Sequence, residues 1–235
     1  IYAVGGVVGQ NGQTGVIRKC ANTANVEGTK HTGGVCGRNY GTIDSCYNTG
    51  NITGNGGGKD GIGGIVGLAG NKDGTYANSV TNCYNTGTIS NNNGRWHGGI
   101  VGMTDKAATV KNCYNVGIIE KGYSWNWNPI IGHVDGGAGN PATENNYSLE
   151  GLNAGDTTDA TKPLTIGTVK AEDEMKTEAF AALLGEAFKA DGKNINNGFA
   201  ILAWQDTGSE PKPGAAWDGK TIDVSWYNTT DKEFH

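Results

Sequence analysis

Four cysteines recur at one position of a repeated segment, and thiols in such a pattern could bind a metal or form disulfides. The segments are "KCANTANV", "SCYNTGNI", "NCYNTGTI" and "NCYNVGII", and their cysteines are Cys20, Cys46, Cys83 and Cys113. Cysteine zinc sites use close pairs such as C-x2-C, and this sequence has no such pair. Steps of 26, 37 and 30 residues instead predict one thiol per layer of a stack, an arrangement that strains disulfide geometry. We therefore expect a buried thiol ladder, with disulfides and a metal site as alternatives.

An aromatic segment, "GYSWNWN" at 122–128, has the composition of a sugar-binding surface. Trp125 and Trp127 share a face if the segment is extended, and indole rings offer a large apolar surface for stacking. Tyr123 adds a third ring, and Arg95 and Trp96 precede them in another glycine-rich corner. We expect these five residues to be candidates for ligand binding. The alternative is that the tryptophans lie beneath a C-terminal helix.

Two acidic residues, Asp60 in "GGGKDG" and Asp73 in "GNKDG", could bind calcium. An EF-hand needs oxygen ligands at alternate positions and a terminal Glu, and neither segment has them. We therefore interpret the two segments as Asp-Gly turns, and a calcium site is the alternative. We expect no other cofactor. Glycoside cleavage needs two carboxyl groups across one cleft, and no such pair follows from the spacing. We expect no catalytic residues and no enzymatic activity. A polysaccharide-cleaving β-helix enzyme remains an alternative by analogy of fold.

A second motif defines the elements that must position these residues. It has the sequences "GGVVG" at 5–9, "GGVCG" at 33–37, "GGIVG" at 63–67 and 98–102, and "NPIIG" at 128–132. Each repeat thus has three short stretches rich in β-branched residues, which favour strands. Stacked coils of such strands form a solenoid. We predict an all-β parallel β-solenoid of about four to five three-stranded coils.

The tyrosines that follow three of the cysteines should point away from the coil interior, because successive side chains of a strand alternate. They are Tyr47, Tyr84 and Tyr114. Aromatic stacking that protects the sheet is the favoured interpretation, and a binding strip is the alternative.

Composition limits the partners. The net charge is −5 and the basic residues form no cluster, so we expect no nucleic-acid partner. No apolar run approaches the roughly 18 residues of a membrane helix, so we expect no membrane insertion. We also expect a monomer. The opening "IYAVGGVVG" begins within the repeat pattern, which suggests part of a longer protein.

The two motifs together resemble the GLUG-type repeats of bacterial cell-surface proteins over residues 4–151. Such repeats occur in large adhesin-like proteins of gut Firmicutes and in the non-catalytic parts of immunoglobulin A proteases. The resemblance implies an extracellular module of the bacterial surface that serves display and interaction. Its expected partner is a host glycan, or a host glycoprotein such as mucin or immunoglobulin, contacted through corner loops or the coil face. A purely structural spacer is the alternative.

The C-terminal part has a different pattern. Within 172–189, one helical face carries Met175, Phe180, Leu183, Leu184 and Phe188. We expect this helix to cover the open end of the solenoid, or else to form a small separate domain.

Two C-terminal stretches extend the resemblance. Residues 179–205 resemble the segment that closes such solenoids, with Ala200 at a usual proline position, and 217–234 resemble an opening strand. The predicted domains are a solenoid at 1–151, a closing strand and helical cap at 152–205, a linker at 206–216, and a following strand or docked tail at 217–235.

Overall fold

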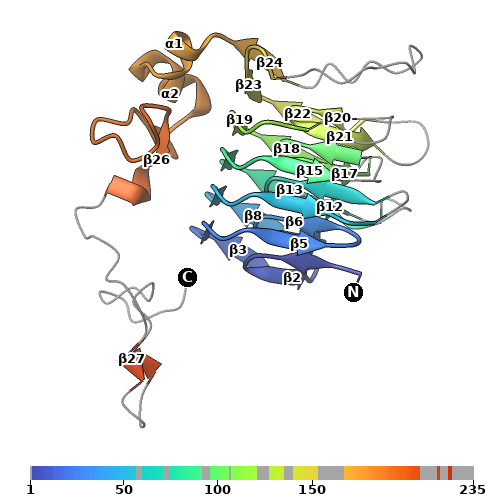
Figure 1. Ribbon diagram of the computed structural model, residues 1–235. Helices are drawn as coiled ribbons and strands as arrows, with labels where there is room; N and C mark the ends of the chain where they lie inside the picture. Colours follow the sequence, from blue (N-terminus) through green and yellow to red (C-terminus); the bar gives the residue numbers. More distant parts are fainter. Residues whose placement is uncertain are drawn as a thin grey trace.

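The fold is a stack of β-coils with a C-terminal segment along one side (Figure 1). The computed structural model describes residues 2–56, 60–70, 75–91, 96–105, 107–120, 127–134, 140–152 and 167–206, with strands at 216–217 and 222–223. Over these residues the chain winds through five coils, and each strand pairs in parallel with its equivalent in the next coil. The predicted parallel β-solenoid is confirmed.

Strands at equivalent positions form five sheets, numbered in their order along a coil. Sheet 1 contains β1 (Val4–Gly5), β6 (Thr32–Gly33), β11 (Gly61–Gly63), β16 (Trp96–Gly98) and β20 (Trp127–Asn128). Sheet 2 contains β2 (Val8–Asn11), β7 (Cys36–Asn39), β12 (Val66–Ala69), β17 (Val101–Thr104) and β21 (Ile131–Val134). Sheet 3 contains β3 (Val16–Arg18), β8 (Thr42–Asp44), β13 (Asn78–Thr81), β18 (Ala108–Lys111) and β22 (Ala142–Glu144).

The last two sheets complete each coil. Sheet 4 contains β4 (Ala21–Asn22), β9 (Tyr47–Asn48), β14 (Tyr84–Asn85), β19 (Tyr114–Asn115), β23 (Tyr147–Leu149) and β24 (Thr168–Lys170). Sheet 5 contains β5 (Val26–Gly28), β10 (Ile52–Gly54) and β15 (Ile89–Asn91), and Ile119 extends it by an isolated bridge to Ile89.

The described coils have more strands than the predicted three, because corners divide two of the three stretches. One corner directly precedes the cysteine position, where the backbone is left-handed with φ of 50–54°. The residues there are Lys19, Ser45, Asn82, Asn112 and Asn145. Asparagine tolerates this conformation better than most residues, so the Ile-x-x-Cys stretch bends rather than continuing as one strand.

The other corner lies within the Gly-Gly motif and links the two motifs physically. A Cβ atom on Gly64 would lie 2.4 Å from Cγ of Asn85, and one on Gly99 would lie 2.4 Å from Cγ of Asn115. The second glycine of each pair therefore packs against the asparagine of the same coil's "CYN" segment, where no larger residue fits.

The solenoid interior is filled by inward rows of β-branched residues and cysteines. The main buried cluster consists of Ile17, Cys20, Val35, Cys36, Ile43, Cys46, Ile65, Val66, Ala69, Val80, Cys83, Ile100, Val101, Val110, Cys113, Ile130 and Ile131. A second inward cluster lies behind sheet 5 and contains Val26, Ile52, Ile62, Ile89 and Ile119. Burial of these apolar side chains stabilises the stacked strands.

The C-terminal closing segment contains α1 (Glu172–Met175), α2 (Glu178–Leu184), β25 (Phe188–Lys189), β26 (Ile201–Leu202) and the 3-10 helix η1 (Ala203–Asp206). Two short helices, α1 and α2, stand where a single helix was predicted. Thr177 begins the second one, because its side chain accepts a hydrogen bond from the Phe180 backbone N–H at 3.1 Å. Leu183 is 47% exposed, so its place on the predicted buried face was wrong.

The closing segment packs on the side of the solenoid, over sheet 4, rather than only over its end. Phe180 and Leu184 share a buried cluster with Tyr84 and Tyr114, which excludes a separate helical domain. Trp204 donates from Nε1 to the backbone oxygen of Ser45 in the second coil, at 2.9 Å. In Figure 1 the segment accordingly descends beside the coils from the end where it leaves them.

Beyond the closing segment, β27 (Ala216–Trp217) pairs antiparallel with β28 (Ile222–Asp223). The predicted domain boundaries stay a prediction. Among the helices of the described residues, none has the length and apolar character needed to cross a membrane.

Candidate functional site

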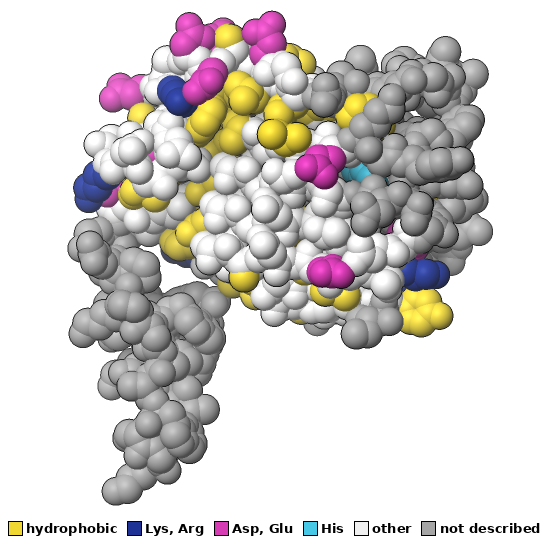
Figure 2. Space-filling view, viewed as in Figure 1, with side chains coloured by type: hydrophobic (Ala, Val, Ile, Leu, Met, Phe, Trp, Pro, Cys, Tyr) yellow, Lys and Arg dark blue, Asp and Glu magenta, His cyan; other side chains and the backbone are white. Residues whose placement is uncertain are grey.

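An open groove of about 400 Å³ lies on the outer face of sheet 5. Its lining consists of Asn25, Val26, Glu27, Asn51, Thr53, Thr88, Ser90 and Glu120. These residues come from the first four coils, so the groove runs along the solenoid axis. Figure 2 views the molecule from this side, and the surface over the sheet is largely uncharged and polar, with separate acidic side chains.

Strand alternation produces the groove. Val26, Ile52 and Ile89 are paired in register and point into the core, so the residues on either side of each point outward. One outward row contains Glu27, Thr53, Ser90 and Glu120, and the other begins with Asn25, Asn51 and Thr88. The groove is therefore set by the repeat itself and stays in register from coil to coil.

The row of asparagines is fixed by hydrogen bonds between coils. The side-chain oxygen of Asn25 accepts from the Asn51 backbone N–H at 3.0 Å, and that of Asn51 accepts from the Thr88 backbone N–H at 3.1 Å. Within the described residues, their Nδ2 groups have no hydrogen-bond partner. The row thus offers oriented donors to a ligand.

The other row combines hydroxyl and carboxyl groups. Thr53 Oγ1 lies 3.2 Å from Ser90 Oγ, at hydrogen-bond distance. Glu27 at one end accepts from Asn55, and Glu120 at the other end is exposed. In-register stacking places the two carboxyl groups roughly three strand spacings apart, about 14 Å. They therefore act as separate acceptors rather than as a catalytic pair.

The predicted ligand-binding candidates lie partly outside the described residues. Tyr123, Trp125, Arg95 and Asp73 lie outside the described residues. Trp127 is half-buried and packs against the inward cluster behind sheet 5.

Trp96 is only 6% exposed, and its ring stacks on that of His133 with centroids 4.1 Å apart. The structure thus places the two described tryptophans among the predicted candidates, Trp96 and Trp127, in packing contacts rather than on an open platform.

Two buried polar residues lie near the same corner. Asp60 is 5% exposed, and burial raises the pKa of its carboxyl group. His97 is 2% exposed, and burial lowers the pKa of its imidazole to about 4. No set of three or more His, Cys, Asp or Glu side chains in the described part of the chain could hold a metal ion.

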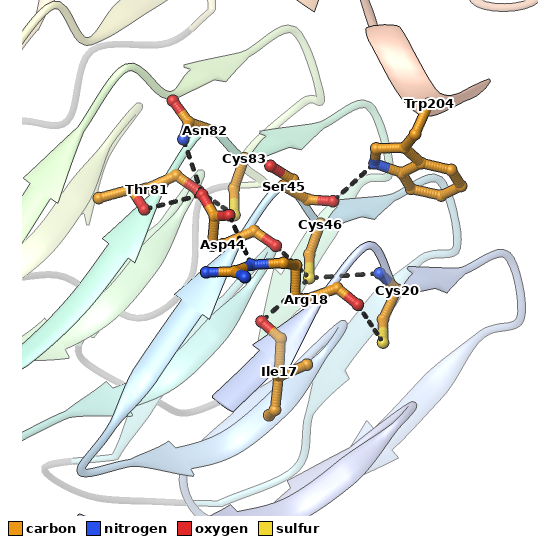
Figure 3. Close-up of polar contacts among 10 residues, drawn as sticks. All are labelled: Ile17, Arg18, Cys20, Asp44, Ser45, Cys46, Thr81, Asn82, Cys83 and Trp204. Carbon is orange, nitrogen blue, oxygen red and sulfur yellow. Dashed lines mark hydrogen bonds and ion pairs between the residues drawn. The ribbon is translucent and has the colours of Figure 1, made fainter. Parts of the chain in front are cut away.

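The four repeat cysteines form an inward row in which each thiol is buried and free. Figure 3 shows Cys20, Cys46 and Cys83 on successive coils. Each thiol donates to the backbone oxygen two residues before it, at 3.3 Å for Cys20, 3.3 Å for Cys46 and 3.0 Å for Cys83. Burial raises the pKa of Cys83. A neutral, buried thiol is a poor nucleophile and metal ligand, so this row serves packing.

The tyrosine row is stacked but not exposed. The ring centroids of Tyr47 and Tyr84 are 5.0 Å apart, and those of Tyr84 and Tyr114 are 5.1 Å apart. Tyr84 and Tyr114 point away from the coil interior as predicted, yet they are 1% and 0% exposed because the closing segment covers them. Asn196 donates to the Tyr114 hydroxyl at 2.7 Å, and that hydroxyl donates to the Ala200 backbone oxygen. A binding strip of tyrosines is therefore excluded on this face.

An asparagine ladder went unrecognised in the sequence. Asn22, Asn48, Asn85 and Asn115 are buried, and the side-chain amide nitrogen of each of the first three donates to the side-chain oxygen of the asparagine in the next coil, at 2.7, 2.7 and 2.8 Å. The available signal was the eroded copy "KCANTANV", which loses the tyrosine and keeps the asparagine.

Comparisons with known proteins agree with this geometry. Residues 2–27 and 28–53 match the family model described as the GLUG motif, so the first two coils are GLUG motif repeats. The fold is similar to the crystal structure of a candidate immunoglobulin A1 protease from Bacteroides ovatus, with a TM-score of 0.58 and 20% identity. The similarity covers 88% of this chain and 76% of that one, and at this identity it shows a common fold alone. No curated protein matches this chain in sequence.

Proposed function

From the premise that the chain carries GLUG motif repeats, we propose that it is a non-catalytic binding module of an extracellular bacterial surface protein. Its ligand is a glycan, free or carried by a host glycoprotein such as mucin or immunoglobulin. The open polar groove on sheet 5 carries the proposal, because its lining residues present hydrogen-bond donors and acceptors from paired strands at one place on the surface.

The chemistry of the other rows supports a binding role over catalysis. The thiols and the stacked tyrosines are buried in packing contacts. Asp44 is held by an ion pair with Arg18 at 3.1 Å, and Glu144 by one with Lys111 at 2.9 Å. A groove of hydrogen-bonding groups on a stiff scaffold can bind a polar polymer without reacting with it.

A glycan array, together with capture of mucin and immunoglobulin by the immobilised chain, tests the proposal. We expect binding to glycans and to the glycoproteins that carry them. No binding to any of these would make the module a spacer instead. Release of reducing ends from a bound polysaccharide would favour the cleaving enzyme.

Two tryptophan variants separate the coil face from the corner loop. If Trp125→Ala or Trp127→Ala abolishes binding while the melting temperature is kept, the aromatic segment that carries them is the site. If binding persists in both variants, the coil face is favoured.

A further inference from the structure

We infer that the groove on sheet 5 binds an uncharged glycan chain that lies along the solenoid axis across the first four coils. This inference rests on the proposed function and specifies its ligand and the direction of binding. It follows from the spacing, the charge and the pairing of the residues that line the groove.

The spacing of the groups favours a polymer with a short repeat. Equivalent side chains on adjacent coils lie about 4.8 Å apart, close to the length of one pyranose in an extended glycan. Asn25 and Asn51 present one row of donors, and Thr53 and Ser90 present one row of hydroxyls. A chain of sugars along the axis can therefore meet a polar group at each coil.

The charge of the groove selects against anionic glycans. The charged lining residues are Glu27 and Glu120, and no Lys or Arg is among the described residues that line it. A sialylated, sulfated or uronate chain would face two carboxylates without a counter-charge. Neutral sugar hydroxyls, in contrast, donate well to carboxylates, and charge-assisted hydrogen bonds are stronger than neutral ones.

The pairing of the strands disfavours an extended peptide. A peptide adds to a sheet through an unpaired edge, whereas the groove lies on the face of sheet 5, centred on β10, which is paired with β5 on one side and with β15 on the other. The residues between the two rows point into the core, so the groove has no pockets for apolar side chains. The groove thus offers hydrogen bonds from side chains, which suits a polyol.

No aromatic ring is among the described lining residues, so the affinity of one site rests on hydrogen bonds. Each such bond contributes little in water, and we expect binding of a single module to be weak. Several modules on one surface would gain avidity on a long polymer.

Titration of the isotope-labelled chain with neutral oligosaccharides, followed by NMR, tests the inference. The probes are mannose, galactose and N-acetylglucosamine oligomers of two to six units, with sialylated and sulfated oligomers of matched length. We expect amide shifts in β5, β10 and β15, and a hexamer Kd at least tenfold lower than that of the dimer. Preferential binding of anionic oligomers, or of polylysine, at these strands would overturn it.

Exposed carboxylates provide matched variants. Glu27→Gln with Glu120→Gln should raise the hexamer Kd about fivefold by removing the charge from two acceptors. Glu186→Gln changes an exposed carboxylate of the closing segment and should leave the Kd unchanged, and all variants should keep the wild-type melting temperature.

The outcomes separate this inference from the proposed function. Glycan binding could shift the amide signals of other residues and be unaffected by the Glu27 and Glu120 variants. That result would overturn the inference about the groove and leave the proposed binding module standing. Absence of binding to every glycan and glycoprotein overturns both.

Discussion

Two neighbouring faces of the solenoid are built by the same repeat but differ in their exposure to solvent. On sheet 4, the outward row of Tyr47, Tyr84 and Tyr114 is stacked and sealed beneath the closing segment. On sheet 5, the outward row with Thr53 and Ser90 remains open as a polar groove. Both rows are in register from coil to coil.

The repeat produces rows of equivalent side chains, and a segment outside the repeat determines which row becomes buried core. The closing segment supplies Phe180, Leu184 and Trp204 to the tyrosine row. No equivalent cover occurs among the described residues over the groove. One face of each coil thereby becomes buried packing, and the adjacent face stays open to solvent.

Tyr114→Ala should give the largest loss in the free energy of unfolding if the covered tyrosine row of sheet 4 acts as buried core. Tyr114 is 0% exposed, stacks on Tyr84 and contacts Phe180 edge-on at 5.8 Å. Loss of a buried aromatic side chain costs about 4 kcal/mol, and urea unfolding measures it. Tyr114→Phe, which removes only the hydrogen bonds of the hydroxyl, should cost about 1 kcal/mol.

Ser90→Ala is the matched change on the open face and should alter the free energy of unfolding by less than about 0.5 kcal/mol. Equal losses from Tyr114→Ala and Ser90→Ala would contradict the contrast between the faces.

Acidification should give the next largest effect, because His97 lies buried and neutral in the interior. Its pKa is about 4 in the folded chain, against an ordinary value of 6.5. The unfolded chain therefore binds the proton more readily, so stability is complete above pH 6.5 and is lost as pH falls towards 4. The loss approaches about 3 kcal/mol, measured by urea unfolding between pH 7.5 and 4.

His97→Gln keeps a hydrogen-bond donor but cannot take up a proton, so it should flatten the part of this slope that His97 causes. His31, whose pKa burial also lowers to about 4, would account for the slope that remains. An unchanged slope in His97→Gln would show that water reaches this part of the interior.

Asn85→Ala should give the smallest of the three losses, about 2 kcal/mol. Its side chain bonds Asn48 at 2.7 Å, Asn115 at 2.8 Å and the Gly87 backbone oxygen at 2.9 Å, all in the interior. Removing it leaves buried polar groups without partners.

Asn51→Ala is the control, because Asn51 is exposed on the groove face and water can replace its bonds. The free energy of unfolding of the Asn51→Ala variant should be lower than that of the wild type by less than about 1 kcal/mol. A loss as large as that of Asn85→Ala would mean that the groove asparagines hold the coils together.

The solenoid could be predicted because its motifs recur in order, with β-branched residues at inward positions such as Ile43 and Val80. The inward thiols followed from the same periodicity. The covered tyrosines could not be predicted, because alternation says only that Tyr84 and Tyr114 leave the interior. What lies over them depends on contacts between residues as distant as Tyr84 and Gln205.

The groove escaped prediction for a related reason. Its residues are short and polar, typical of any turn, and Glu27 is far from Glu120 in the sequence. Only stacking brings them into one hollow. The aromatic candidates were chosen by composition, yet Trp127 packs against the inward cluster behind sheet 5, and Trp96 is buried in a separate cluster with Leu68 and Met103.

The contact of Trp204 with Ser45 has a mechanical consequence. The closing segment leaves the last coil and returns along the side, so that Trp204 is anchored on the second coil. Tension applied between Tyr2 and Asp206 therefore enters the solenoid through its first two coils and the anchored segment. The later coils carry load only after the closing segment detaches from the tyrosine row. The solenoid should therefore resist extension in two steps, detachment of the segment first and unfolding of the coils second.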